Sequence, residues 1–132
     1  AMLVIYESVF GVVCDSPYNY KGQPGSDFLK LVPSTWDETR FISGYPGESV
    51  LLARRSGERW FVGGMTNEDA REISFIPDFL EEGTHTATLW KDGEDAANSP
   101  ASLVKEEIQD LTRESLIKVK VEKGGGFVMI LD

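Results

Sequence analysis

The chain has 132 residues, 22 of them acidic and 13 basic, and a net charge of −9. This length fits one domain with its own core. The acidic balance disfavours nucleic acid and anionic membranes as partners, because phosphate binding depends on lysine and arginine. The only cysteine is Cys14, which excludes an internal disulfide framework and a cysteine-rich metal site.

Residues 3–13, LVIYESVFGVV, are apolar almost all round. Periodicity does not separate a buried helix from a buried strand here, and the valine and isoleucine content favours a strand. In either conformation the segment must be covered on most sides. It is too short to span a bilayer and lacks the basic start and the cleavage site of a signal peptide.

From residue 39 onward the pattern alternates as in β-strands. About eight short strands are predicted, at residues 40–42, 49–55, 59–65, 72–76, 84–90, 102–110, 116–121 and 127–131. Gly63 and Gly64 lie inside one of them and indicate a bulge or a close backbone approach. Sequential antiparallel strands of this length pack face to face, so the predicted fold class is an all-β, two-sheet antiparallel sandwich.

Asp37 and Glu38 are the best candidates for a pair of catalytic carboxylates. Glycoside hydrolysis needs two carboxyl groups about 5–10 Å apart across the bond, whereas adjacent residues of an extended segment point in opposite directions. We therefore expect loop hydrogen bonds, capping or a contact with a neighbouring domain. Of Arg54 and Arg55, we expect one to face solvent or pair with a glutamate and the other to reach a neighbouring domain.

Three tryptophans are candidates for a sugar-stacking platform, which would need exposed rings. Trp60 and Trp90 lie in alternating strands, where a tryptophan typically joins the core or packs between domains. Trp36 lies in a loop, so packing and sugar contact both stay open for it.

No metal or cofactor site is predicted. His85, the only histidine, has no nucleophile motif or Cys/His partner and is expected to be a hydrogen-bonded strand residue. The spacing of Asp92, Glu94 and Asp95 does not fit an EF-hand and indicates a solvated acidic loop. The glycines at 124–126 lack the residues of a phosphate loop and predict a turn.

Short pieces of the chain, taken in order, resemble the C-terminal domain of glycoside hydrolase family 97, the bacterial α-glucosidases and α-galactosidases. They are Val32-Pro33, Thr35-Trp36-Asp37-Glu38-Thr39, Gly47-Glu48, Ala53-Arg54-Arg55, Trp60-Phe61-Val62-Gly63, Thr66-Asn67, Phe79-Leu80, Asp92-Gly93 and Gly124-Gly125-Gly126-Phe127. No single piece is specific, but the ordered set covers nearly the whole chain. Near the N-terminus, residues 4–8, 15–17 and Tyr20 resemble the last barrel helix of the family and the loop after it. This changes the expectation for residues 3–13 from strand to helix.

The resemblance implies a parent protein of three parts: an N-terminal β-sandwich, a (β/α)8 barrel and this C-terminal sandwich. Residues 1–33 would be the remnant of the last barrel helix and a linker, and residues 34–132 the C-terminal domain. The family's catalytic carboxylates, and the calcium that some members use, would lie outside this chain. The fragment itself is then expected to be a non-catalytic accessory domain that packs on the barrel, stabilises it and supports oligomer contacts. The alternative is an independent carbohydrate-binding module that takes an oligosaccharide.

The candidate residues for contact with the barrel or with a sugar are Trp36, Asp37, Glu38 and Trp60. Without the barrel, the apolar residues 3–13 would form a bare patch. We expect this helix either to fold back onto the sandwich or to pair with a second chain. The resemblance alone suggests a periplasmic or exported parent.

Overall fold

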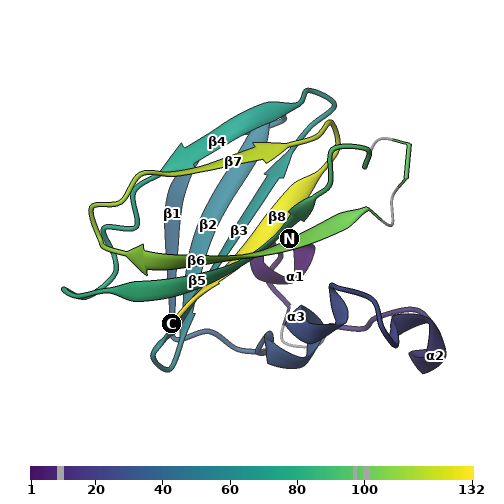
Figure 1. Cartoon of the computed structure of the whole chain (residues 1–132), viewed down its shortest axis with the longest axis horizontal. Coiled ribbons are helices and arrows are strands. Elements are labelled where there is room, and N and C mark those ends of the chain that lie inside the picture. The colour runs from purple at the N-terminus through teal and green to yellow at the C-terminus, as the bar shows by residue number, and fades with distance from the viewer. Residues whose placement is uncertain (9–10, 97, 100–101) are drawn as a thin grey trace.

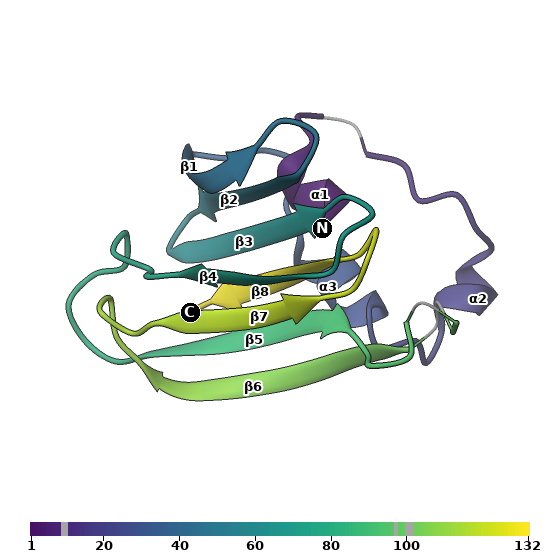
Figure 2. The ribbon, with the colours of Figure 1, turned by 90° about the horizontal axis from the view of Figure 1, so that it is seen from above.

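The computed structural model describes residues 1–8, 11–96, 98–99 and 102–132. Within these ranges, eight strands form two antiparallel sheets that face each other, and short helices lie on the far side of the larger sheet (Figures 1 and 2). This arrangement confirms the predicted all-β sandwich. Among the described residues, no helix has the length and hydropathy needed to cross a membrane.

The larger sheet has six strands in the order β1-β2-β3-β8-β5-β6. Their bounds are Glu38–Tyr45 for β1, Ser49–Ser56 for β2, Arg59–Thr66 for β3, Gly126–Leu131 for β8, His85–Asp92 for β5 and Leu103–Leu111 for β6. The smaller sheet pairs β4 (Arg71–Phe75) with β7 (Ile117–Val121). Each strand overlaps a predicted one; β1 is the most extended relative to its prediction, because it pairs with β2 as far as Tyr45.

The main core lies between the two sheets. Alternate residues of β7, Ile117, Val119 and Val121, are buried there, while Lys118 and Lys120 face solvent, as the alternation predicted. The inner face of the larger sheet contributes residues such as Phe127, Met129 and Leu131. We call this side the inner face; it is closed by β4, β7 and the connection that carries Phe79 and Leu80.

The two consecutive glycines of β3 allow close packing on opposite faces of the larger sheet. A Cβ on Gly64 would lie 2.2 Å from the ring of Phe127 on the inner face. A Cβ on Gly63 would lie 2.9 Å from Cβ of Val4 on the other side. The predicted close approach is therefore confirmed, and the irregularities of pairing occur elsewhere, between Phe41 and Ser43 and between His85 and Ala87.

The opposite side, which we call the outer face, is covered by the N-terminal part of the chain. Helices α1 (Met2–Ile5) and α3 (Ser26–Leu31) lie near this face, and α2 (Pro17–Tyr20) projects away from it (Figure 2). Val4 and Phe28 are buried in a second apolar cluster. The sheet residues of that cluster are Phe61, Trp90, Val128 and Ile130.

The prediction of a helix over residues 3–13 was wrong beyond Ile5. Tyr6 already has extended backbone angles (φ −81°, ψ 135°), and residues 11–14 are not helical; residues 9 and 10 lie outside the described ranges. Helical stability in proteins comes mostly from packing an apolar stripe. Among the residues of α1 only Val4 is fully buried, and Val12 and Val13 are each more than half exposed.

Candidate docking surface on the outer face

An apolar groove runs between the N-terminal segment and α3. Its volume is about 580 Å³. Several of its side chains are largely exposed: Tyr6 and Met2 by 58%, Val12 by 64% and Val13 by 53%. The residues that line it are Ala1, Met2, Leu3, Tyr6, Ser8, Gly11, Val12, Val13, Phe28, Leu29, Val32, Pro33 and Ser34.

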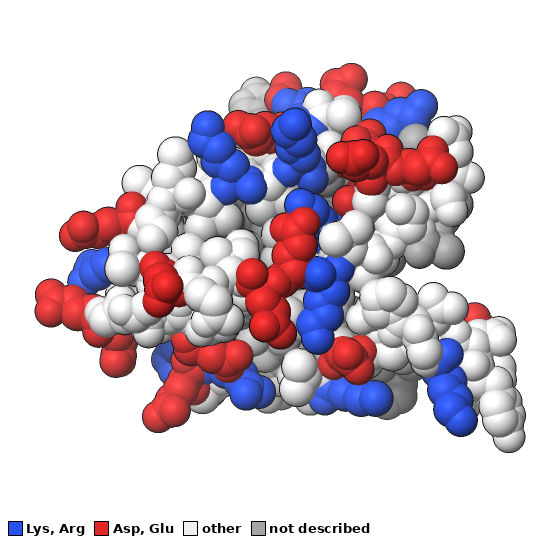
Figure 3. Space-filling model, viewed as in Figure 1, with Lys and Arg blue, Asp and Glu red and all other residues white. Residues whose placement is uncertain are grey.

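The charge distribution sets this region apart from the rest of the surface. The described residues that line the groove include no lysine, arginine, aspartate or glutamate, whereas charged side chains of both signs are spread over the face seen in Figure 3. Exposed apolar patches with little charge are typical of surfaces that contact another protein or domain. The groove is therefore the strongest candidate for a docking surface in the described part of the chain.

Arg54 of β2 holds the N-terminal segment on the outer face. Its side chain is 4% exposed, and its Nη1 lies 2.9 Å from Oε2 of Glu7. Nη2 donates a hydrogen bond to the carbonyl oxygen of Ile5 at 3.3 Å. Its Nε has no hydrogen-bond partner among the described residues. A buried guanidinium thus fixes the chain where it leaves α1.

Trp36 lies at the margin of the same cluster. Its ring is half-buried and meets Phe61 edge-on, with 5.3 Å between ring centroids. The guanidinium carbon of Arg54 lies 5.7 Å from the centroid of the Trp36 ring, within the range of a cation–π contact. Trp36 is thus the candidate residue that the structure places beside the N-terminal segment.

Asp37 and Glu38 both form hydrogen bonds with residues of the β2–β3 hairpin. The Asp37 carboxylate accepts a hydrogen bond from the backbone N–H of Gly57 at 2.8 Å, and its own N–H donates to the carbonyl of Arg55. Glu38 accepts from Nε of Arg40 at 2.6 Å and from Nε of Arg55 at 3.4 Å. These are the loop hydrogen bonds expected from the sequence, and they occupy the polar atoms that acid–base chemistry would use.

Arginine contacts also change the ionisation of Glu38. The hydrogen bond from Arg40, and to a lesser extent that from Arg55, lowers the pKa of Glu38 below its ordinary value of 4.5. A general acid at neutral pH needs the opposite shift. Glu38 is therefore held as a carboxylate at neutral pH.

The two strand tryptophans lie on opposite faces of the larger sheet. Trp60 is 6% exposed and packs on Phe79 in the inner core, with 4.5 Å between centroids. Trp90 is 3% exposed and packs on Phe28 of α3, and its Nε1–H donates to the carbonyl of Pro24. Both pack as the strand pattern predicted; a role of Trp60 in contact with a barrel or a sugar stays a prediction.

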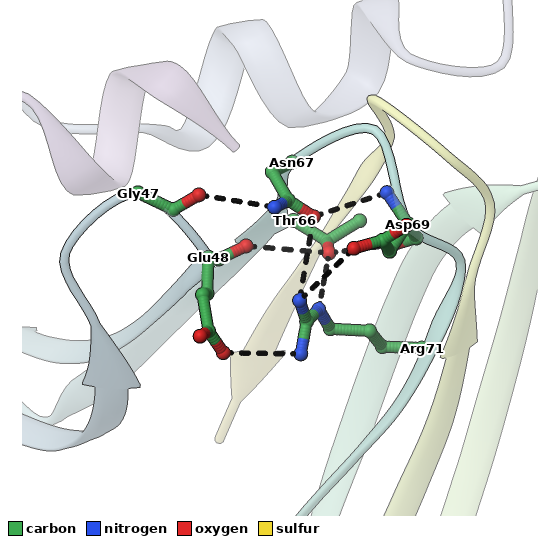
Figure 4. A network of polar contacts seen from close by, with 6 residues as sticks. All are labelled: Gly47, Glu48, Thr66, Asn67, Asp69 and Arg71. Carbon is green, nitrogen blue, oxygen red and sulfur yellow. Dashed lines mark hydrogen bonds and ion pairs between the residues drawn. The ribbon is translucent and has the colours of Figure 1, made fainter.

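Arg71 is the centre of a polar network that joins three turns (Figure 4). Its Nε donates to Oγ1 of Thr66 at 3.0 Å, and its other nitrogens reach Glu48 and Asn67 at 3.4 Å. Asn67 in turn donates to the carbonyl of Gly47 and accepts from Gly124 N–H through its backbone. The polar atoms of this network are used within the protein, so its role is to fix the turns.

The remaining polar candidates also have structural roles. His85 has both ring nitrogens beside carbonyl oxygens, of Asp132 and Glu81, as a hydrogen-bonded strand residue should. Oδ2 of Asp92 accepts from the N–H of Gly126 at 2.8 Å. Gly124 has φ +67°, which fits the predicted turn. The described residues contain no group of three or more His, Cys, Asp or Glu side chains that fits a metal ion, so no calcium ligand set is assigned to them.

Sequence reasoning predicted one side of this groove, because residues 3–13 were expected to form a bare apolar patch without the barrel. The residues of its other side, within 28–34, were given no surface role. The expectation for the arginine pair was closer, because Arg55 pairs with Asp37 and Glu38 while Arg54 turns to the outer face. The sequence signal for this role of Arg54 was its position in the alternation of β2, which places it on the outer face.

Comparison with known proteins gives consistent matches. A family described as the glycosyl hydrolase 97 C-terminal, oligomerisation domain matches residues 35–132. A retaining α-galactosidase of Bacteroides thetaiotaomicron is 38% identical over 130 residues, 98% of this chain and 20% of that protein. A probable retaining α-galactosidase of Streptomyces bingchenggensis is 38% identical over 128 residues, 96% of this chain and 19% of that protein.

A solved structure agrees in fold as well as in sequence. A glycoside hydrolase family 97 enzyme from Pseudoalteromonas sp. strain K8, in complex with panose, superimposes with a TM-score of 0.90 at 29% identity, over 99% of this chain and 21% of that one. The chain thus spans about a fifth of the length of these relatives. Because the family match extends over residues 35–132, the chain belongs to the family of C-terminal domains of glycosyl hydrolase 97 enzymes.

Proposed function

We propose that this chain is the non-catalytic C-terminal accessory domain of an α-glycosidase and docks through its outer-face groove onto the catalytic barrel of the same protein. The observation that carries the proposal is the groove itself. It is apolar, the described part of its lining contains no charged side chain, and all of these lining residues precede position 35, where the family match begins. The relatives are about five times longer than the chain, so they contain a large partner for this surface.

The physical argument is the area that the groove leaves open to water. Met2, Tyr6, Val12 and Val13 are each more than half exposed. Covering each of these side chains would contribute on the order of 1 kcal/mol to the free energy of docking, because about half of its surface is still exposed to water. A barrel seated on the groove would therefore stabilise both partners.

The activity of the whole protein is part of the same proposal. The names of the relatives support hydrolysis of α-galactosidic or related α-glycosidic bonds by the barrel, with the accessory domain stabilising it and supporting oligomer contacts. We also propose a periplasmic or exported parent, which the family resemblance supports. Cell fractionation followed by detection of the protein tests the location.

An independent carbohydrate-binding module is the second candidate. It would need exposed, coplanar aromatic rings on one sheet face. Trp60 and Trp90 are buried, which leaves half-buried Trp36 as the tryptophan that a sugar can reach. Calorimetric titration of the chain with maltooligosaccharides and α-galactosides separates the candidates: the accessory role predicts no binding heat, and saturable binding that Trp36→Ala removes would favour the module.

A chimera tests the docking proposal directly. The part of the Bacteroides thetaiotaomicron α-galactosidase that matches this chain is replaced by this chain, and Val12→Asp and Val13→Asp are introduced. In the isolated chain both residues are exposed, so the substitutions should leave its thermal unfolding nearly unchanged. In the chimera the carboxylates would be buried against the barrel, and we expect a lower unfolding temperature and a lower yield of soluble enzyme.

The matched control is Leu116→Asp, which places a carboxylate on another apolar residue that is 59% exposed, next to β7. It should be neutral in both proteins. The proposal fails if the groove variants are as harmless in the chimera as the control, or if Leu116→Asp is the more damaging change.

A further inference from the structure

We propose that β1 is the edge through which two copies of this domain associate, related by a two-fold axis. The inference rests on the proposed function, since the family description names oligomerisation. It places self-association away from the groove, which leaves the groove free for the barrel. Residues 3–13 were expected either to fold back onto the sandwich or to pair with a second chain, and the packing of α1 on the outer face agrees with the first alternative.

The larger sheet has two free edges, β1 and β6, and they differ in composition. Phe41 and Tyr45 of β1 are 66% and 69% exposed, and six of the eight residues of β1 are exposed. The charged residues of β1 are Glu38 and Arg40, which pair with each other at 2.6 Å. The edge is therefore electrically neutral and carries two exposed aromatic rings.

The β6 edge has the features that keep strands apart. Its sequence LVKEEIQDL contains one lysine and three acidic residues, a net charge of −2. Repeated charge on an edge strand opposes pairing with another chain.

Charge placement along β1 also favours pairing with its own copy. Glu38 and Arg40 lie in the first half of the strand, and Ser43, Gly44 and Tyr45 in the second half carry no charge. Antiparallel pairing about the middle sets the charged half of each copy against the uncharged half of the other. Such a contact is self-complementary, as a two-fold interface must be.

The net charge of the chain also bears on which edge two copies can share. Each chain carries −9, so two copies repel each other over most of their surfaces. Of the two edges of the larger sheet, β1 is neutral and is the one that two copies approach at the lower electrostatic cost. The register shift between Phe41 and Ser43 interrupts regular pairing there, so the aromatic rings rather than a continuous ladder supply the contact.

Sedimentation velocity of the 132-residue chain over a range of concentrations tests the inference. The wild-type chain should show reversible association, and the double variant Phe41→Lys with Tyr45→Lys should raise the dissociation constant about tenfold or more. Both side chains are exposed, so circular dichroism should show an unchanged fold and thermal transition. The matched control, Val104→Lys, adds a lysine to the β6 edge at a residue that is 37% exposed and should leave association unchanged.

A second variant, Val12→Lys, distinguishes this edge from the groove. Loss of association in Val12→Lys, with association kept in the β1 variant, would overturn the inference and place the contact in the groove. A wild-type chain that stays monomeric at every concentration would also overturn it. Neither result decides the docking proposal, because that proposal is tested by the chimera and not by sedimentation of the chain alone.

Discussion

The two faces of the six-stranded sheet bury similar residues but are closed in different ways. On the inner face, β4 and β7 cover the sheet, and the core between the layers includes Phe127 and Val119, each 1% exposed. On the outer face, the four-residue helix α1 and α3 cover a smaller cluster and leave the apolar groove beside them. The inner face is complete within this chain, whereas the outer face leaves apolar surface for a partner.

The two faces of this sheet therefore have different roles. Strand alternation gives the sheet two apolar faces, and the inner face forms the core of the domain. The outer face is only partly covered by the chain's own residues, which is the expected state of a surface that docks onto another domain. The following predictions test whether the faces differ in this way, from the largest expected effect to the smallest.

Phe127→Ala should be the most damaging substitution, because it empties the inner core under Gly64. We expect a loss of about 3–5 kcal/mol in the free energy of unfolding, measured by urea denaturation. Gly64 packs its backbone directly against the Phe127 ring and has no side chain that could fill the cavity left by the substitution. A loss below that of a typical surface substitution would show that the inner face is loosely packed.

Val119→Ala and Val4→Ala make the same change on the two faces. Val119→Ala should lower the free energy of unfolding by about 2 kcal/mol, because it removes two methyl groups from a closed core. Val4→Ala should lower it by less, although Val4 is 0% exposed, because the N-terminal segment can open locally while the sandwich stays folded. Chemical denaturation of both variants measures the difference; equal losses would mean that the outer face belongs to the same cooperative unit.

Arg54→Met should loosen the N-terminal segment without unfolding the domain. Methionine fills a similar apolar space, and Glu7 is 76% exposed and so returns to water when the guanidinium is removed. We therefore expect a change within about 1 kcal/mol. The hydrogen bond to the Ile5 carbonyl and the contact with Glu7 are lost, so the amides of residues 2–7 should exchange faster. Arg55→Met is the matched control and should leave that exchange unchanged, since Arg55 contacts Asp37 and Glu38 instead.

Glu38→Gln should have the smallest effect, and one that depends on pH. Because the folded-state pKa of Glu38 lies below 4.5, its ionised form stabilises the fold above that pH, and this contribution is lost as the pH falls through the folded-state pKa. The wild-type chain should therefore be slightly more stable than the variant at neutral pH, and the two should converge in acid. Thermal unfolding across this range measures the gap; a gap that widens toward low pH would contradict the assignment.

Much of the inner face could be predicted from the sequence because its information is local. The alternation of β7 fixes which side chains face the core, and the two glycines of β3 marked a close approach that Val4 and Phe127 then supply. Asp37 and Glu38 were expected in loop contacts, and the hairpin uses them in that way.

The outer face could not be predicted in the same way, because its shape depends on distant contacts. Residues 3–13 are apolar on all sides and so contain no period that marks where a helix ends. The end of α1 is set by its contact with Gly63 and by Arg54, which lies 49 positions away from Ile5 in the chain. The groove arises where this segment meets α3, and no sequence pattern joins those two pieces.

Hydrogen exchange by mass spectrometry, comparing the chain alone with the same chain in the chimera, tests the central claim most directly. If the groove docks onto the barrel, exchange in the chimera should slow at residues 1–8, 11–13 and 28–34 and stay unchanged in β4 and β7. Slower exchange in β4 and β7, with the groove residues unchanged, would mean that the barrel meets the opposite side of the sandwich and that the outer face is not its docking surface.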